Sequence, residues 1–371
     1  METFAPDAPT RVAYRQARAA GATRHRDIAQ SLGISEGELI AAHVQPDAAA
    51  DGLVATRLWG PWPGLVATLE TVGDVMALTR NEHCVHEKTG TYRHASAEGP
   101  AGREVGLVLG TEIDLRLFYS QWQHGFAVTE TGERGLQRSL QFFDAGGNAM
   151  HKVFTRSGTD LAAWSRLIER YLAVNQEAEL DLRAAAPAAA EKPDAEVDTA
   201  AFHEQWASLR DTHHFHGLLR RHGLTRTQAL RLAQPRFAQR VDVGAAHEVL
   251  QAAAAQGLPI MVFVGNPGAI QIHTGPVKRV MRMGPWLNVM DPGFNLHLRE
   301  DRISAAWVVR KPTTDGLVTS LELFDDKGLA VAQMFGERKP GRPELGAWRR
   351  LAEGLVSDGQ WQAQPDGCPT C

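Results

Sequence analysis

The sequence is poor in cysteine, in long hydrophobic stretches and in segments that direct secretion. Three cysteines among 371 residues are too few for a disulfide-stabilised secreted domain and suit a reducing compartment. The longest purely apolar runs, such as IMVFV at 260–264, are far shorter than the ~20 residues that a membrane-spanning helix needs. The N-terminal METFAPDAPTRV has neither the basic nor the apolar region of a secretory signal. We therefore expect a cytoplasmic protein without membrane insertion.

A surplus of positive charge and the common nucleotide-binding motifs are also missing. The formal net charge of -4 argues against a protein whose main ligand is nucleic acid, because neutralising phosphates requires excess Lys and Arg. There is no GxGxxG motif after a strand and no GxxxxGK[ST] loop. Electrons for any redox chemistry would therefore come from outside or from a non-nucleotide cofactor.

The only CxxC motif is formed by Cys368 and Cys371 at the end of the chain. A zinc site would need two further ligands at suitable spacing, and a CxxCH motif for covalent haem attachment is absent. We interpret this pair as surface thiols.

The chain contains one long segment twice. SLQFFDAGGNAMHKVF (139–154) and SLELFDDKGLAVAQMF (320–335) are identical at seven of sixteen positions, at an offset of 181. Further pairs keep the same order: GATR (21–24) with GLTR (223–226), NEHCVHEKTG (81–90) with NPGAIQIHTG (266–275), and IDLRL (113–117) with FNLHL (294–298). The slowly changing offset is what insertions would produce. We predict an N-terminal repeat at 1–182, an Ala/Pro/Glu-rich linker at 183–200 and a C-terminal repeat at 201–371.

Each repeat begins with helical patterns and continues with short β-rich runs separated by Gly and Asp-Lys-Gly turns. Each closes with a helix, around Trp164 in the first repeat and Trp348 in the second. This order predicts an α+β fold, in which each half is a large antiparallel sheet with flanking helices.

Residues 24–44 contain the pattern of a helix-turn-helix motif, with Ser35-x-x-Glu38 as a capping box for the second helix. That helix carries Glu36 and Glu38 where a DNA-reading helix would carry Arg or Asn. We favour a structural helix pair and keep a DNA-binding regulator as the least favoured alternative.

The segment DTHHFHGLLRRHG (211–223) concentrates histidine. Asp211 or Thr212 is expected to cap a helix that ends at Gly223. On that helix His213 and His216 share a face, whereas His214 points elsewhere. Solvated histidines on a polar face are the simplest interpretation, but the repeat argues against it, since His213 and His216 correspond to Arg11 and Tyr14 in the first copy.

Apolar and cationic residues accompany this histidine pair. Phe215, Leu218 and Leu219 make the helix amphipathic. The second half also carries cations that could bind an anionic ligand, namely Arg226, Lys311 and Arg338. Imidazole, apolar cover and paired cations together match a flat iron-containing ring with two carboxylates, which is haem.

Five segments give the chain a resemblance to a known family over nearly its whole length. They are DTHHFHGLLRRHGLTRTQALRLA, NEHCVHEKTGTY, IDLRLFYSQW, GNPGAIQIHTGPV and MFGERKPGRPEL. The chain resembles the hemin-degrading factor family, the cytoplasmic haem-binding proteins of the HemS, HmuS, ChuS and PhuS type from bacterial haem-uptake systems. The resemblance implies two similar α+β halves with haem in a cleft between them.

The resemblance also implies roles for individual residues. His213 falls on the axial ligand of the haem iron, and His216 falls on a second histidine found in some members. Arg116 falls on the distal arginine, with Phe118 as a packing aromatic. The remaining haem contacts fall on Arg226, Lys311, Gln333, Phe335 and Arg338. Some members have a tyrosine just before the glutamine, where this chain has Ala332.

The expected function is cytoplasmic haem binding in haem uptake and iron acquisition, with oxidative degradation that releases iron. This would be a haem-oxygenase-like reaction with an external electron donor. The alternative is a chaperone that delivers haem, without turnover, to a separate haem oxygenase. Expected partners are haem and an importer, oxygenase or reductase protein, and the chain is expected to be a monomer or dimer.

Overall fold

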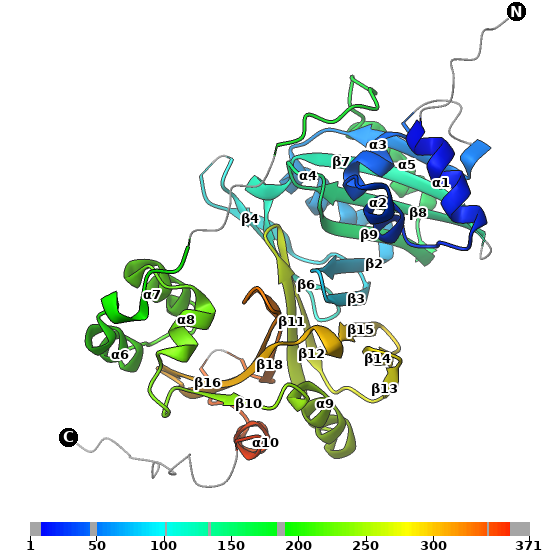
Figure 1. The fold of residues 1–371 in the computed structure, drawn as a ribbon. Helices are drawn as coiled ribbons and strands as arrows, with labels where there is room; N and C mark the ends of the chain where they lie inside the picture. The colour runs from blue at the N-terminus through cyan, green and yellow to red at the C-terminus, as the bar shows by residue number, and fades with distance from the viewer. Residues whose placement is uncertain are drawn as a thin grey trace, which may run out of the picture. The chain divides into compact units, whose positions relative to one another are not determined.

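In the computed structural model the chain forms two compact units (Figure 1), and residues 9–44, 50–100, 102–132, 135–183, 190–339 and 341–356 are described. The first unit comprises Met1–Arg80, Val85–Pro187 and Gly265–Gln271, and the second comprises Asn81–Cys84, Ala188–Val264 and Ile272–Cys371. Cys368 and Cys371 lie outside the described residues. None of the described helices is long and apolar enough to cross a membrane.

The strands form two nine-stranded sheets, in the orders β1-β7-β8-β9-β2-β3-β15-β14-β13 and β10-β16-β17-β18-β11-β12-β6-β5-β4. The strands of the first repeat are β1 (Leu53–Leu58), β2 (Gly73–Arg80), β3 (Cys84–Gly90), β4 (Ala95–Glu98), β5 (Val105–Leu109), β6 (Asp114–Phe118), β7 (His124–Gly132), β8 (Gly135–Phe143) and β9 (Ala149–Thr159). Those of the second are β10 (Ala238–Val241), β11 (Ile260–Asn266), β12 (Ala269–Gly275), β13 (Val280–Met283), β14 (Trp286–Asp291), β15 (Phe294–Arg299), β16 (Ala305–Thr313), β17 (Gly316–Phe324) and β18 (Ala330–Gly336). The two orders correspond strand for strand, with β10 for β1, β16 for β7 and β6 for β15. The predicted large antiparallel sheets are confirmed, and the matching orders follow from the duplication.

The second unit has helices on both faces of its strands. The helices are α6 (Thr199–Ala207), α7 (His214–His222), α8 (Arg226–Arg231), α9 (Ala245–Gln256) and α10 (Gly346–Gly354). Helices α9 and α10 pack on one face, where Trp348 joins strand residues such as Leu321 and Met334. Helices α6 to α8 pack on the other face, where Phe215 and Trp206 join Val309 and Phe324. Figure 1 shows these two helix groups on opposite sides of the strands.

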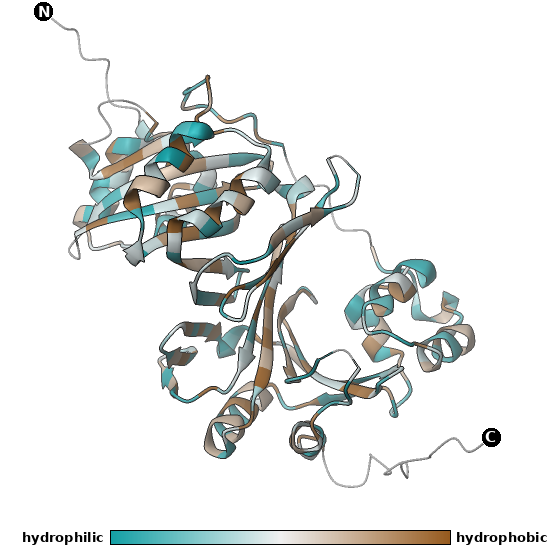
Figure 2. Ribbon diagram, turned by 180° about the vertical axis from the view of Figure 1, so that it is seen from behind, coloured by the Kyte–Doolittle hydropathy of each residue, from teal (hydrophilic) through white to brown (hydrophobic). Residues whose placement is uncertain are grey.

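The first unit repeats this layering. Its helices are α1 (Pro9–Ala19), α2 (His25–Leu32), α3 (Glu36–Ala41), α4 (Trp62–Thr68) and α5 (Leu161–Arg170). Helices α1 to α3 pack against Phe126, Val128 and Phe143, whereas α4 and α5 pack against a separate cluster that includes Leu140 and Trp164. Hydrophilic and hydrophobic segments alternate along the helices (Figure 2), as expected for helices with one buried face. The predicted closing helices around Trp164 and Trp348 are confirmed.

Two asparagines show how closely the repeats correspond. The side-chain oxygen of Asn81 accepts the backbone N–H groups of the residues two and three positions later, at 3.1 and 2.9 Å, and that of Asn266 does the same at 2.9 and 3.0 Å. Their amides donate to the backbone carbonyls of Val331 and Met150, both at 2.8 Å. Asparagine suits such a position because it satisfies donors and acceptors of a tight turn at once.

The helix pair at residues 24–44 is structural. The capping box predicted at Ser35 is present, with Glu38 N–H to Ser35 Oγ at 3.2 Å and Ser35 N–H to the Glu38 carboxylate at 2.7 Å. The second helix, α3, buries Leu39 and Ile40 completely. Glu36 is also buried and its carboxylate binds Arg80 and Lys152. A helix buried in this way has no face left to read DNA bases, so the least favoured alternative loses its support.

Candidate functional site

The histidines predicted to bind a ligand lie at the start of α7, and one carboxylate orients the first of them. Oδ1 of Asp211 accepts the backbone N–H of His213 at 2.8 Å and lies 2.7 Å from Nδ1 of the same residue. The backbone N–H of His213 lowers the pKa of Asp211, burial opposes this, and the imidazole lowers the pKa further. The side chain of His213 is 87% exposed. With Nδ1 held by Asp211, Nε2 is the nitrogen that can bind a ligand.

The helix begins later than predicted. Its first residue is His214, and His213 occupies the N-cap without a side-chain capping bond. Asp211 does not cap the helix because its carboxylate is engaged with His213. The end is as predicted, since Gly223 adopts the left-handed conformation with φ of 62° that glycine favours.

Helix α7 is amphipathic in the predicted sense. Phe215, Leu218 and Leu219 are buried in the core of the second unit, whereas His214 and His216 are exposed. The corresponding helix of the first repeat differs, because Arg11 and Tyr14 are buried there and Arg11 binds Asp51 at 2.5 Å. Only the second copy presents side chains to solvent at these two positions.

Beneath α7 lies a buried charge cluster that we call the Glu322 triad, made of Arg226, Lys311 and Glu322. Nε and Nη2 of Arg226 donate to the two carboxylate oxygens at 2.6 and 2.8 Å. Nζ of Lys311 donates to Oε1 at 2.7 Å, and the hydroxyl of Ser320 donates to the same oxygen at 2.9 Å. Glu322 is fully buried and Lys311 nearly so, whereas the side chain of Arg226 is 25% exposed. Two cations that the sequence predicts as ligand contacts therefore share one protein carboxylate.

The electrostatics of the triad follow from burial and pairing. Burial alone would raise the pKa of Glu322, but the charges of Arg226 and Lys311 outweigh it and hold the pKa well below the ordinary value. Burial lowers the pKa of Lys311 to about 8, although Glu322 opposes the shift. One carboxylate against two cations leaves the triad with one positive charge, which suits an additional anionic group beside the exposed part of Arg226.

Gln333 and Phe335 lie on the same sheet face as Glu322. In the register of β17 and β18, Glu322 is opposite Gln333, and Ser320 is opposite Phe335. Residues that alternate along a strand share a face. Both side chains are half-buried, and the ring of Phe335 meets that of Phe263 edge-on at 5.0 Å. This face thus offers aromatic surface beside polar groups.

Two other positions lie apart from the Glu322 triad. Ala332 belongs to the buried core on the α9 and α10 side of the strands, so its side chain points away from that of Gln333. Arg338 follows β18, and its Nη2 lies 3.5 Å from a carboxylate oxygen of Asp315.

Arg116 and Phe118 belong to the first unit, on β6. They alternate with the buried Leu115 and Leu117, so both lie on the half-exposed face of that strand. The guanidinium of Arg116 binds the Asp114 carboxylate and donates to the carbonyl of Leu115 at 3.0 Å. A side chain held in this way is partly exposed and has donors left for a ligand.

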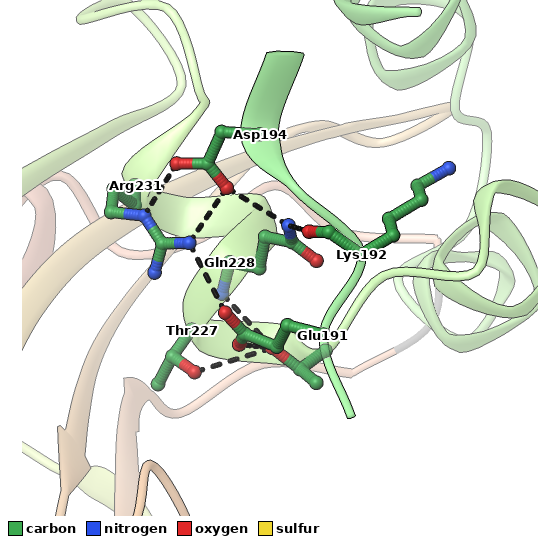
Figure 3. Close-up of polar contacts among 7 residues, drawn as sticks. Glu191, Lys192, Asp194, Thr227, Gln228 and Arg231 are labelled. Atoms are coloured by element: carbon green, nitrogen blue, oxygen red, sulfur yellow. Dashed lines mark hydrogen bonds and ion pairs between the residues drawn. The ribbon is translucent and has the colours of Figure 1, made fainter. Parts of the chain in front are cut away.

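Residues 190–196, which the sequence assigns to the linker, contact α8 (Figure 3) and also the end of α7. Arg231 donates to both carboxylate oxygens of Asp194, at 3.0 and 2.7 Å. The side-chain amide of Gln228 donates to the carbonyl of Lys192 at 2.7 Å and to Asp194 at 2.9 Å. Nζ of Lys192 donates at 2.6 Å to a backbone carbonyl at the C-terminal end of α7. This part of the linker therefore braces the helix that carries the histidines.

Sequence reasoning missed Glu322, the residue that joins the predicted cations. One signal was available, because Ser320, Glu322 and Phe324 alternate with Leu321 and Leu323 in a strand that is apolar on its other face. A carboxylate at a position that should be buried requires a cationic partner. The partners could not be identified, since Arg226 is 96 residues away in sequence.

The described residues of the second unit fit one end of a haem. The contact of Asp211 with Nδ1 of His213 orients the imidazole and leaves Nε2 as the donor atom. Phe335 supplies an aromatic surface, and the triad supplies the positive charge that a propionate requires.

Comparisons with known proteins agree with this chemistry. The model of the Haemin-degrading HemS.ChuX domain matches residues 33–171 and again 223–355. The chain is 39% identical over 346 residues to the hemin transport protein HmuS of Yersinia pestis, covering 93% of this chain and 96% of HmuS.

Two solved structures are similar over almost the whole chain. Holo-PhuS, a heme-binding protein from Pseudomonas aeruginosa, is 49% identical with a TM-score of 0.90, covering 95% of this chain and 99% of PhuS. The heme degrading enzyme ChuS of Escherichia coli O157:H7 is 39% identical with a TM-score of 0.85, covering 94% of this chain and 99% of ChuS.

Proposed function

The chain belongs to the Haemin-degrading HemS.ChuX domain family, and we propose that it binds haem in the cytoplasm during haem uptake. The observation that carries the proposal is the exposed imidazole of His213 with its Nδ1 held by Asp211. This is the arrangement that fixes a histidine for binding a metal through Nε2. We assign His213 as the axial ligand of the haem iron and His216, one turn along the same helix, as the alternative ligand.

The other contacts are assigned by chemistry. Phe335 would pack beside the haem ring and Gln333 beside its edge. The exposed part of Arg226 would bind a propionate. Lys311 supplies charge from beneath, and Arg338 would provide a further cation for a carboxylate once it leaves Asp315.

We propose that oxidative haem degradation with release of iron follows binding. Haem supplies an iron that reacts with oxygen when an external donor reduces it. The part assigned to Arg116 is to donate hydrogen bonds on the distal side, because a guanidinium keeps its charge and has five donors. Phe118 would limit access of water beside it. Delivery of haem to a separate haem oxygenase without turnover uses the same binding residues and stays the alternative.

A titration with hemin tests both versions. We expect a Soret shift that saturates at one hemin per chain, followed by loss of the band when a reductant and oxygen are added. Absence of a Soret shift at equimolar hemin would refute haem binding. A band that survives the reductant, with no tetrapyrrole product, would favour delivery to a partner. The partner would then be the importer that supplies haem or the oxygenase that receives it.

A further inference from the structure

Glu322 is a buried carboxylate on the sheet face that also carries Gln333 and Phe335. Its two oxygens accept four hydrogen bonds, from Arg226 twice, from Lys311 and from Ser320. Oε1 accepts three of these bonds and Oε2 accepts one, and the side chain is fully buried, so neither oxygen is exposed to a ligand. Glu322 therefore acts on other side chains and does not itself contact haem.

The cations that Glu322 binds both contact one aromatic ring of α7. The guanidinium carbon of Arg226 lies 5.3 Å from the ring centroid of Phe215, and Nζ of Lys311 lies 4.9 Å from it. Phe215 is buried, and its ring meets that of Trp206 edge-on at 4.6 Å. Cations over an aromatic face attract it, more strongly where water is excluded. The Phe215 ring is thus held by the cations of Arg226 and Lys311 and by the indole of Trp206.

Phe215 transmits this restraint to the histidines because it lies between them on the first turn of α7. His213 precedes it by two residues and His216 follows it directly. A rotation of the helix about its axis, or a shift along it, would move Phe215 off both cations. The position of the ring therefore sets the direction in which the two imidazoles point.

The first repeat provides an internal comparison. At the offset of 181, Glu322 corresponds to Gln141 and Lys311 to Glu130, and at the helical offset of 202, Phe215 corresponds to Ala13. The serine is kept, since Ser139 corresponds to Ser320, and it accepts a bond from Gln141 at 3.1 Å. The copy that lacks the histidine pair thus also lacks the triad and the ring above it.

We propose that Glu322 is a positioning residue for the histidines of α7. By binding Arg226 and Lys311, it keeps both cations against the ring of Phe215 and so fixes the first turn of the helix. The inference deepens the proposed function, on which it rests for the identity of the ligand.

Hydrogen exchange of the α7 amides in the protein without hemin tests the restraint directly. Glu322→Gln keeps the shape but removes the carboxylate that holds Arg226 and Lys311 against Phe215, so α7 should exchange at least about tenfold faster than in the wild type. Glu344→Gln is the matched control, because Glu344 is also buried but binds Thr319 and Arg349 near α10. We expect that control to leave α7 exchange within about twofold of the wild type.

Rescue separates a charge-balance role from simple packing. Glu322→Asp keeps the negative charge on a shorter side chain, and α7 exchange should stay within about threefold of the wild-type rate. In parallel, the resonance Raman and electron paramagnetic resonance spectra of the hemin complex should show mixed axial ligation in Glu322→Gln and a single species in Glu322→Asp. Unchanged α7 exchange in Glu322→Gln, or exchange in Glu322→Asp that is as fast as in Glu322→Gln, overturns the proposal.

The proposal can still be tested if Glu322→Gln fails to fold or if the wild-type protein fails to bind hemin. If Glu322→Gln does not fold, Phe215→Leu keeps an apolar side chain without the ring face and should accelerate α7 exchange in the same way, whereas wild-type exchange in that variant overturns the proposal. If the wild-type protein fails to bind hemin, the proposed function is lost, but the exchange measurements still decide whether Glu322 restrains α7.

Discussion

A single carboxylate oxygen of Asp211 accepts the backbone N–H of His213 and lies 2.7 Å from its Nδ1. The same oxygen therefore holds both the backbone and the imidazole of His213, the residue that directly precedes α7. It also commits Nδ1, so that the exposed Nε2 is the atom available to a ligand.

Replacing His213 tests its assignment as the axial ligand. His213→Ala should weaken hemin binding at least about tenfold and change the Soret position, because one imidazole ligand is lost. His216→Ala should have a smaller effect, and the double variant should lose histidine ligation altogether. His214→Ala is the matched control, since this exposed neighbour lies off the shared face. Hemin spectra that stay unchanged in His213→Ala would show that another residue is the ligand.

Removing the orienting carboxylate should weaken ligation without removing the ligand. Asp211→Ala is expected to lower hemin affinity by about 10-fold to 100-fold, the usual effect of losing a carboxylate that orients a metal-binding histidine. The melting temperature should change little because Asp211 is exposed. Titration and thermal unfolding measure the two effects, and equal affinities in both proteins would disprove the orienting role.

Arg116 should matter more for turnover than for binding. Arg116→Ala should leave the hemin dissociation constant within about threefold of the wild type and slow hemin loss under reductant and oxygen by about tenfold or more. Arg93→Ala, an exposed arginine of the same unit, is the control. Equal degradation rates in Arg116→Ala and the wild type would exclude a distal role.

The lowered pKa of Lys311 predicts how stability depends on pH. Between pH about 8 and 10.5 the unfolded chain keeps a proton on this lysine that the folded chain releases. Lys311 therefore increases the free energy of unfolding as pH rises from about 8 to 10.5. This contribution is lost again as pH falls back to 8. Denaturant unfolding at pH 7 to 10 should show this rise in the wild type and not in Lys311→Met. Lys327→Met, at an exposed turn, should follow the wild type, and parallel curves for all three proteins would contradict the prediction.

Local chemistry explains which features could be predicted from the sequence. The Ser35 capping box, the end of α7 at Gly223 and the closing helices around Trp164 and Trp348 depend on residues a few positions apart. Thr225 and Gln228 form half of a capping box for α8, because the Thr225 hydroxyl accepts the N–H of Gln228 at 3.1 Å. The amide of Gln228 instead reaches the linker, which no local pattern could show.

Sequence alone is enough to identify the duplication, the α+β composition of each repeat and the helix on which the histidines lie. Hydrophobic periodicity, turn residues and the comparison of one copy with the other predict these features. The folded chain is needed to see that Arg226 and Lys311 share Glu322, and that both lie against Phe215. The reason is that a buried carboxylate must find its counter-charges wherever the sheet register and the helix packing place them, and neither is encoded in the spacing of residues along the chain.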